Sequence, residues 1–211
     1  MVLREKTYKI IKERIISGEY RPGQPLKEKE IIDELKISRT PFREAVNALN
    51  EENLVQIFPN RGIFVRELTL LDITNGFDIR YLLEPYAVEL ACARMPKRVV
   101  KHLLTRIEKI SPTDYKALLD EDSYFHTELL NYTDNKQLNR IMKNLYEYNH
   151  FQVILLNDPA SNDMQNARIR DAFQSLAEHR EILDCMLNSD TSGAVRAMQC
   201  HITSAKKRAL Q

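Results

Sequence analysis

The 211-residue chain has few cysteines, almost no net charge and no long apolar run. Its three cysteines, Cys92, Cys185 and Cys200, are odd in number and form no CxxC pair, which argues against a disulfide scaffold and fits a reducing compartment. The 31 basic and 30 acidic residues leave a net charge of +1, so any polyanionic partner must be met by a local patch. No stretch approaches about 18 uninterrupted apolar residues, so we predict no membrane contact and expect a cytoplasmic protein.

Glycine is scarce and unevenly distributed along the chain. Three of the five glycines, Gly18, Gly23 and Gly62, lie in the first 63 residues, so this part turns more tightly than the rest. The length lies between one average domain and two. A hydrophobic fraction of 43% with 29% charged residues is typical of a globular protein that can bury a core. We therefore expect two domains, residues 1–68 and 69–211.

The first domain has the pattern of three helices followed by a hairpin. Apolar residues at helical spacing predict helices over 8–16 and 26–35, and a third helix begins at Ser38, where serine can cap the first turn. Two β-type runs, 54–58 and 63–67, are joined by the turn sequence Pro-Asn-Arg-Gly. Three helices followed by a two-stranded hairpin make a winged helix-turn-helix.

The second domain has no convincing strand and is predicted to be entirely helical. Short connections between long amphipathic segments imply an antiparallel bundle of six or seven helices, with a kink at Pro85. The fold class is therefore mainly α. The six expected helices cover residues 71–94, 97–110, 114–132, 135–157, 163–188 and 191–209.

The third helix of the first domain carries the best candidates for reading DNA. Arg39 and Arg43 are four residues apart, on one face of its first turns, with Thr40 beside them. Arginine suits this role because its two-pronged guanidinium can bond guanine O6 and N7 together. Lys29 and Arg61 could add contacts from the preceding helix and the hairpin tip. Taken alone, such an arginine pair is more often an ordinary solvated helix surface.

The surrounding motif resembles the GntR family of bacterial transcription regulators. It consists of Gly18-x-Tyr20-x-Pro22-Gly23-x-x-Leu26-x-Glu28, then Ser38-Arg39-Thr40-Pro41-Phe42-Arg43-Glu44-Ala45, then Asn60-Arg61-Gly62. The resemblance implies DNA contact by Lys29, Arg39, Arg43 and the wing tip Arg61-Gly62, with Thr40 alongside. Two positions depart from the family: Lys36 stands where glycine is usual, and Ile32 where alanine is usual. A left-handed lysine would cost about 1–2 kcal/mol.

The helical domain contains a possible metal-binding set. Asp122 and His126 are four residues apart on one helix, and His179 and His201 lie on two later helices. One carboxylate and three imidazoles that converge in a bundle would bind a divalent transition ion. The spacing alone also fits a surface Asp–His pair and histidines that are unrelated core or exposed residues.

A second resemblance bears on this domain. Arg80-x-x-x-Glu84, Asp122-x-x-Phe125-His126, Glu178-His179-x-x-Ile182 and Ala194-x-x-Ala197-Met198-x-x-His201 resemble the FCD domain, the FadR-type ligand-binding domain. In its metal-binding members the ligands match Asp122, His126, His179 and His201. The resemblance therefore implies zinc, nickel or manganese. It also implies a small organic or sugar acid as effector, which Arg80 would contact if it is not simply paired with Glu84. Tyr146 and His150 could line the same cavity or be plain core or surface residues.

Together these features predict a homodimeric transcription regulator that binds palindromic operator DNA and responds to a small carboxylate through a metal-containing helical domain, rather than an enzyme. Two alternatives stay open. A helical metallohydrolase with a DNA-binding head would use an open metal site, with Glu178 as the candidate general base. A purely structural metal would instead have its coordination closed by protein groups. The sign of regulation is left open.

Overall fold

The computed structural model describes residues 3–67, 69–155 and 162–210, and their side chains apart from those within 147–168. The chain divides into two compact units, Met1–Thr69 with Glu147–Asp158, and Leu70–Tyr146 with Pro159–Gln211. Each unit is described by itself. Within the described ranges no helix is both long enough and apolar enough to cross a bilayer.

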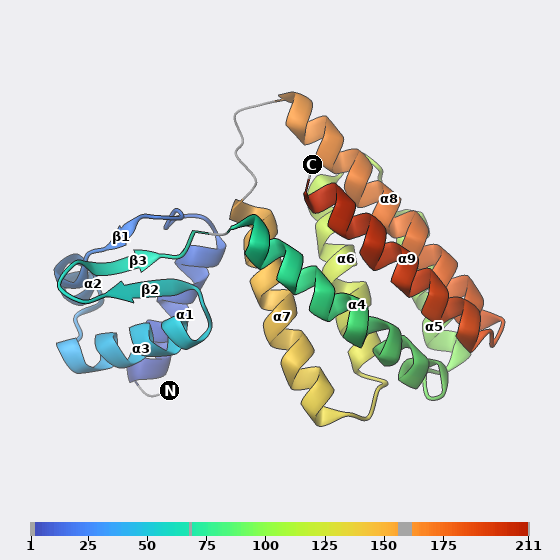
Figure 1. Ribbon diagram of the computed structural model, residues 1–211, viewed down its shortest axis with the longest axis horizontal. Helices are drawn as coiled ribbons and strands as arrows, with labels where there is room; N and C mark the ends of the chain where they lie inside the picture. Colours follow the sequence, from blue (N-terminus) through green and yellow to red (C-terminus); the bar gives the residue numbers. More distant parts are fainter. Residues whose placement is uncertain (1–2, 68, 156–161, 211) are drawn as a thin grey trace. The chain divides into compact units, whose positions relative to one another are not determined.

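The first unit is a three-helix fold with a small antiparallel sheet (Figure 1). The sheet has strand order β1-β3-β2, and β2 and β3 form the predicted hairpin, with Val55 opposite Val65 and Phe58 opposite Gly62. The core contains the apolar positions of the helical pattern, including Ile11, the inward face of α3 and the strand residues. The elements are α1 (Leu3–Ile16), β1 (Pro25–Leu26), α2 (Glu28–Leu35), α3 (Arg39–Glu51), β2 (Val55–Phe58) and β3 (Gly62–Val65).

The predicted start of the second helix of this unit is wrong. The second helix was expected to begin at Leu26, but Pro25 and Leu26 form strand β1, which pairs with β3 through Leu26 and Ile63. The helix α2 begins only at Glu28. A two-residue strand is too short to show alternation, so only its partner strand defines it. The buried Leu26 serves the core from the sheet instead of from the helix.

The turn between α2 and α3 has the strained backbone that the sequence indicated. Lys36 caps the end of α2 in the left-handed conformation, with φ 52° and ψ 47°, and its N–H bonds the carbonyl of Ile32. Glycine is favoured here because a Cβ in this conformation crowds the backbone. Ser38 is the N-cap residue of α3, although its side chain makes no capping hydrogen bond.

The second unit is the predicted helical bundle, and within the described ranges it has six helices (Figure 1). Helix α9 packs against both α4 and α8, and α6 packs against α8 and α4. The short connection after α8 makes α8 and α9 antiparallel neighbours. Pro85 lies within α4, where it is buried. The helices are α4 (Leu70–Cys92), α5 (Lys97–Lys109), α6 (Tyr115–Leu130), α7 (Lys136–Leu155), α8 (Asn162–Leu187) and α9 (Thr191–Ala209).

The core of this unit surrounds a group of buried polar side chains. Apolar residues such as Phe125, Ile182 and Met198 are fully buried between α4, α6, α8 and α9. Arg80, Glu84, His126, His179 and His201 are buried among the same helices. Burying so many polar groups is unfavourable unless they are bonded to one another or to a ligand. The bundle therefore stabilises a specific polar arrangement at its centre.

Candidate metal centre and DNA-reading face

The predicted DNA-reading residues of α3 lie on its solvent face. Arg39, Thr40 and Arg43 are exposed, and the Arg39 side chain is 81% accessible. Its Nε lies 3.6 Å from Glu28 Oε1, a loose contact at the protein surface. The opposite face of the helix, which includes Phe42, is buried. Amphipathic packing thus fixes which way the arginines point and leaves them exposed to solvent.

The other predicted contacts are also exposed. Lys29 lies on α2, and Arg61 lies at the turn between β2 and β3. The Arg61 guanidinium is 5.9 Å from the centre of the Phe58 ring, a cation–π contact. Gly62 has φ +110°, a conformation that L side chains rarely adopt, so glycine is required at this wing turn. Contact of these residues with DNA stays a prediction.

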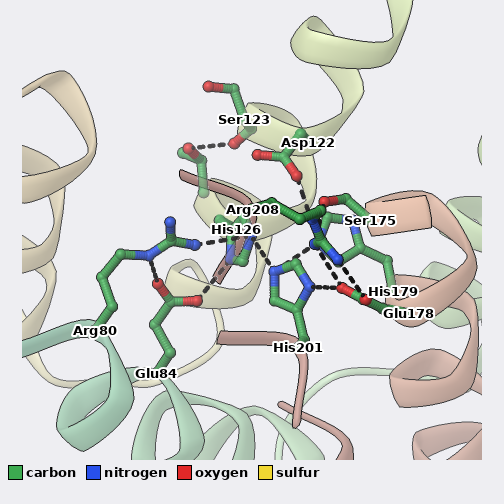
Figure 2. Close-up of polar contacts among 11 residues, drawn as sticks. Arg80, Glu84, Asp122, Ser123, His126, Ser175, Glu178, His179, His201 and Arg208 are labelled. Carbon is green, nitrogen blue, oxygen red and sulfur yellow. Dashed lines mark hydrogen bonds and ion pairs between the residues drawn. The ribbon is translucent and has the colours of Figure 1, made fainter. Parts of the chain in front are cut away.

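The four predicted metal ligands come together in the bundle (Figure 2). One ligand atom from each of Asp122, His126, His179 and His201 lies within 4.8 Å of the others. Helix α6 supplies Asp122 and His126 from adjacent turns, because residues four apart share a face. Helices α8 and α9 supply one histidine each. The three imidazoles are buried, and Asp122 is partly exposed.

The distances between the donor atoms fit a metal ion. The Nε2 atom of His201 is 3.3 Å from Nε2 of His126 and 3.3 Å from Nε2 of His179. Nitrogen ligands at about 2.0–2.1 Å from one ion stand about 3.0–3.4 Å apart. Asp122 Oδ1 lies 3.6 Å from Nε2 of His179. One hard oxygen and three imidazole nitrogens suit a divalent transition ion such as zinc, nickel or manganese.

The surroundings of His179 and His201 favour the neutral form of these two imidazoles. Burial lowers the pKa of His179 well below its ordinary value. Burial likewise lowers the pKa of His201, and this effect exceeds the opposite influence of its bond to Glu178. A histidine must be deprotonated at the nitrogen that binds a metal. The cluster is therefore prepared to offer nitrogen lone pairs near neutral pH.

A buried ion pair flanks His126. Arg80 Nε donates a hydrogen bond to Glu84 Oε1 at 2.5 Å, and Glu84 Oε2 lies 2.7 Å from His126 Nδ1. Burial would raise the pKa of Glu84, but the charge of Arg80 and the influence of the adjacent His126 outweigh it and lower that pKa. Arg80 Nη2 also lies 3.3 Å from His126 Nε2. The structure thus shows the Arg80–Glu84 pair that the sequence left open, at the edge of the cluster.

A second pair flanks His201 on the opposite side of the cluster (Figure 2). Glu178 Oε2 is 2.7 Å from His201 Nδ1, and Arg208 donates to both carboxylate oxygens at 2.7 and 2.9 Å. Burial alone would raise the pKa of Glu178, but the bonds from Arg208 and His201 lower it to about 2. A carboxylate held in this way is a poor general base at neutral pH. The hydrolase interpretation of Glu178 thus loses its support.

Two of the three proposed effector-contacting residues lie beside the cluster. The Tyr146 ring centre is 5.5 Å from the His126 ring centre, and the Arg80 guanidinium is 5.9 Å from the Tyr146 ring. Burial raises the pKa of Tyr146 well above its ordinary value, so its hydroxyl keeps its proton. The side chain of His150 lies outside the described residues. The effector role of all three stays a prediction.

Sequence reasoning missed the partners of the ligand histidines. Glu84 was considered only as a partner of Arg80, Glu178 only as a base, and Arg208 not at all. One signal was present: Arg208 follows His201 by seven residues, two helical turns along the same face. The bond to Glu178 was not predictable in this way, because it joins two helices.

The comparisons with known proteins assign both units. Residues 3–65 match the family described as bacterial regulatory proteins, gntR family, and residues 75–204 match the FCD domain. The chain therefore belongs to the GntR family of bacterial transcription regulators, and its FCD domain fits the FadR-like subfamily. These families and the relatives are transcription regulators and not enzymes, which confirms that expectation.

Two curated relatives are about 30% identical to this chain. The Nta operon transcriptional regulator of Aminobacter aminovorans is 31% identical over 63% of this chain and 64% of its own length. The gluconate operon transcriptional repressor of Bacillus subtilis is 30% identical over 63% of this chain and 56% of its own length. The match thus spans less than two thirds of each relative.

A solved structure resembles the whole chain. The putative transcriptional regulator GntR from Rhodococcus sp. RHA1 has a TM-score of 0.79 and 25% sequence identity, over 98% of this chain and 97% of that one. The likeness covers both the winged helix-turn-helix and the helical bundle. The predicted fold class, mainly α with these two parts, is therefore confirmed.

Proposed function

We propose that this protein is a cytoplasmic, homodimeric repressor that binds palindromic DNA. A small organic or sugar acid would raise or lower its affinity for that DNA. Residues 1–68 would form the DNA-binding domain, and residues 69–211 the effector-binding and dimerisation domain. The observation that carries the proposal is the convergence of Asp122, His126, His179 and His201 in an FCD domain of a GntR-family chain. The repressor assignment follows the name of the gluconate-operon relative.

The chemistry of the site supports a carboxylate effector. A bound zinc, nickel or manganese ion would supply a positive charge to which a carboxylate oxygen can bond. Four protein ligands leave further positions free if the ion takes six ligands. Arg80 has guanidinium nitrogens beside the cluster in addition to the Nε that holds Glu84, and Tyr146 has a protonated hydroxyl. These donors would hold the second oxygen of the effector.

An exposed apolar face on α4 supports the dimer. Leu71, Ile79, Leu82 and Tyr86 share one side of the helix, and Leu82 is 71% exposed. Apolar side chains grouped in this way on a soluble protein typically mark a protein–protein contact. A palindromic operator requires two DNA-binding units related by a two-fold axis, and a second copy of this chain supplies that symmetry. We therefore assign this face to the partner copy.

Signal transfer then needs two arrangements of the dimer with different affinity for the effector. Coupling of about 1–3 kcal/mol is typical of such proteins. The segment between β3 and α4 is short. A shift of α4 would therefore be passed on to the DNA-binding unit and change the separation of the two DNA-binding units in the dimer. The α3 helices of the two copies would then fit successive major grooves of the DNA in one arrangement only.

A thermal-shift screen tests the proposal and separates it from catalysis. Purified protein is heated with succinate, citrate, gluconate and glucuronate, each with and without a chelator. We expect at least one acid to raise the melting temperature only when the metal is present, and to change the gel-shift affinity for operator DNA. A panel of esters, amides and phosphates should not be turned over. Stabilisation that survives chelation would contradict the metal-dependent site, and turnover would favour the hydrolase.

A further inference from the structure

The three ligand histidines of the cluster differ in what contacts their outer ring nitrogen, Nδ1. Nδ1 of His201 is hydrogen-bonded to Glu178, which Arg208 holds, whereas Nδ1 of His126 lies 2.7 Å from Glu84 Oε2 without a hydrogen bond between them. Nδ1 of His179 is buried and has no hydrogen-bond partner within the described ranges. The His179 ring instead stacks on Phe125, with ring centres 3.9 Å apart and planes 18° apart. Packing orients His179, and a hydrogen-bonded carboxylate orients His201.

We propose that Glu178 and Arg208 are positioning residues for the metal, acting through His201. This inference rests on the proposed metal-dependent function and deepens it. Glu178 fixes the proton of His201 on Nδ1, which leaves the Nε2 lone pair pointing into the cluster. Arg208 holds the Glu178 carboxylate through two parallel hydrogen bonds, a geometry that only a guanidinium provides.

The geometry around Glu178 leaves little freedom for another arrangement. Its Oε1 accepts from Arg208 Nη1, and its Oε2 accepts from Arg208 Nη2 at 2.9 Å. The Arg208 Nη2 group also bonds the buried Ser175 Oγ at 3.0 Å, one turn before Glu178 on α8. Arg208 and Glu178 are each mostly buried, with side-chain accessibilities of 13% and 17%. The pair therefore ties the last turn of α9 to α8 at the metal cluster.

A carboxylate behind a metal-bound histidine fixes its tautomer and raises its basicity, and its loss typically weakens metal binding by about 10–100-fold. The Arg80–Glu84 pair beside His126 is buried within the bundle, so variants there would disturb the core. Glu178 and Arg208 are at the margin of the bundle and can be substituted more safely. They also act in series, so the effects of their substitution should not add.

The test is a zinc titration of the full-length protein against a competing chromogenic chelator. We expect Glu178→Gln and Arg208→Met to weaken Zn²⁺ binding by about 10–100-fold. The double variant should bind no more weakly than Glu178→Gln alone. Arg208→Lys should restore only part of the loss, because a lysine cannot bond both oxygens in parallel. Glu181→Gln, an exposed carboxylate on the same helix, is the matched control and should bind like the wild type.

A second readout separates positioning from mere folding. Nitrogen-15 NMR of the metal-free protein should show the His201 proton on Nδ1 in the wild type and in Glu181→Gln, and a redistributed proton in Glu178→Gln. Melting of the metal-free variants checks that each one folds. If Glu178→Gln does not fold, Arg208→Met and Arg208→Lys decide the question by the same measurements.

The outcomes distinguish this inference from the proposed function. Wild-type protein that binds no Zn²⁺ would overturn both. Wild-type protein that binds one ion, with Glu178→Gln and Arg208→Met equal to Glu181→Gln in affinity and tautomer, would overturn the positioning role alone. Losses in Glu178→Gln and Arg208→Met that add fully in the double variant would show that Arg208 does not act through Glu178.

Discussion

The two functional regions of this protein are built in opposite ways. The reading face of α3 carries Arg39 and Arg43 in the open, with side chains that solvent surrounds. The cluster in the helical bundle has its three imidazoles buried, and charged partners hold two of them. An exposed cation binds by long-range attraction and adapts to its partner, whereas a buried ligand set must be arranged before the ion arrives. The difference suits a DNA groove in one case and a small ion in the other.

This contrast has a consequence for mutational tolerance. A substitution on the reading face removes an interaction with the partner and should leave the fold intact, because its side chains are exposed and the Arg39–Glu28 contact at the surface is loose. A substitution in the cluster also leaves other buried polar groups without a partner, which costs about 1–3 kcal/mol for each group. Substitutions on the reading face of the first unit should thus change DNA binding without changing stability. Substitutions in the cluster of the second unit should change metal binding and stability together.

The largest expected effect is loss of the metal on removal of a ligand. We expect elemental analysis to find about one divalent ion per chain in the wild type, and almost none in His201→Ala or His179→Ala. Exposed His102 provides the matched control, since His102→Ala removes an imidazole that faces solvent. Equal metal content in all four proteins would show that the cluster is a polar core without an ion. Circular dichroism verifies that the variants fold.

The reading face should respond next most strongly. Replacing Arg39 or Arg43 by alanine should weaken operator binding by about 1–3 kcal/mol, because each arginine would lose its bond to a guanine edge. Metal content and melting temperature should be unchanged, which sharpens the contrast with the buried cluster. Gel shifts at a fixed salt concentration measure the effect. Unchanged affinity in both variants would remove this helix from the DNA interface.

The apolar face of α4 predicts an intermediate effect on assembly. Leu82→Glu would bring a charge into the proposed dimer contact, and we expect the dimer to weaken about tenfold or more, which is about 1.4 kcal/mol. Leu3→Glu places the same charge at an exposed position of α1 and should leave the dimer intact. Sedimentation equilibrium over a range of concentrations distinguishes the two. A Leu82→Glu protein that stays as dimeric as the control would place the partner copy on another face.

The smallest effect concerns the strained turn before α3. Lys36→Gly should stabilise the first unit by about 1 kcal/mol, because glycine adopts the left-handed conformation without crowding its Cβ. Lys36→Ala keeps the Cβ and should give no such gain. Chemical denaturation followed by circular dichroism measures both. DNA affinity should not change, since the lysine lies outside the reading face. A stabilisation by alanine equal to that by glycine would mean that the conformation is not the cause.

The local elements of this protein follow from short-range patterns in its sequence. The helical period, the turn residues and the prolines predicted the six bundle helices to within about two residues, because these signals are local in the chain. The last two residues of the expected helix 135–157 lie outside the described residues. The same reasoning failed for β1, whose two residues are a strand only by virtue of their bonds to β3. The ligand set was identified by resemblance, since spacing alone did not distinguish it from unrelated histidines.

Tertiary structure decided what those elements do together. His179 lies eight residues before the end of α8 and His201 ten residues after the start of α9, so folding back at the short connection brings them level. The contact of Glu178 with Arg208 depends on the rotation of each helix about its own axis, which packing of the whole bundle fixes. Hydrogen bonds between residues 30 positions apart have no local signature, because sequence patterns report a helix face and not its neighbour.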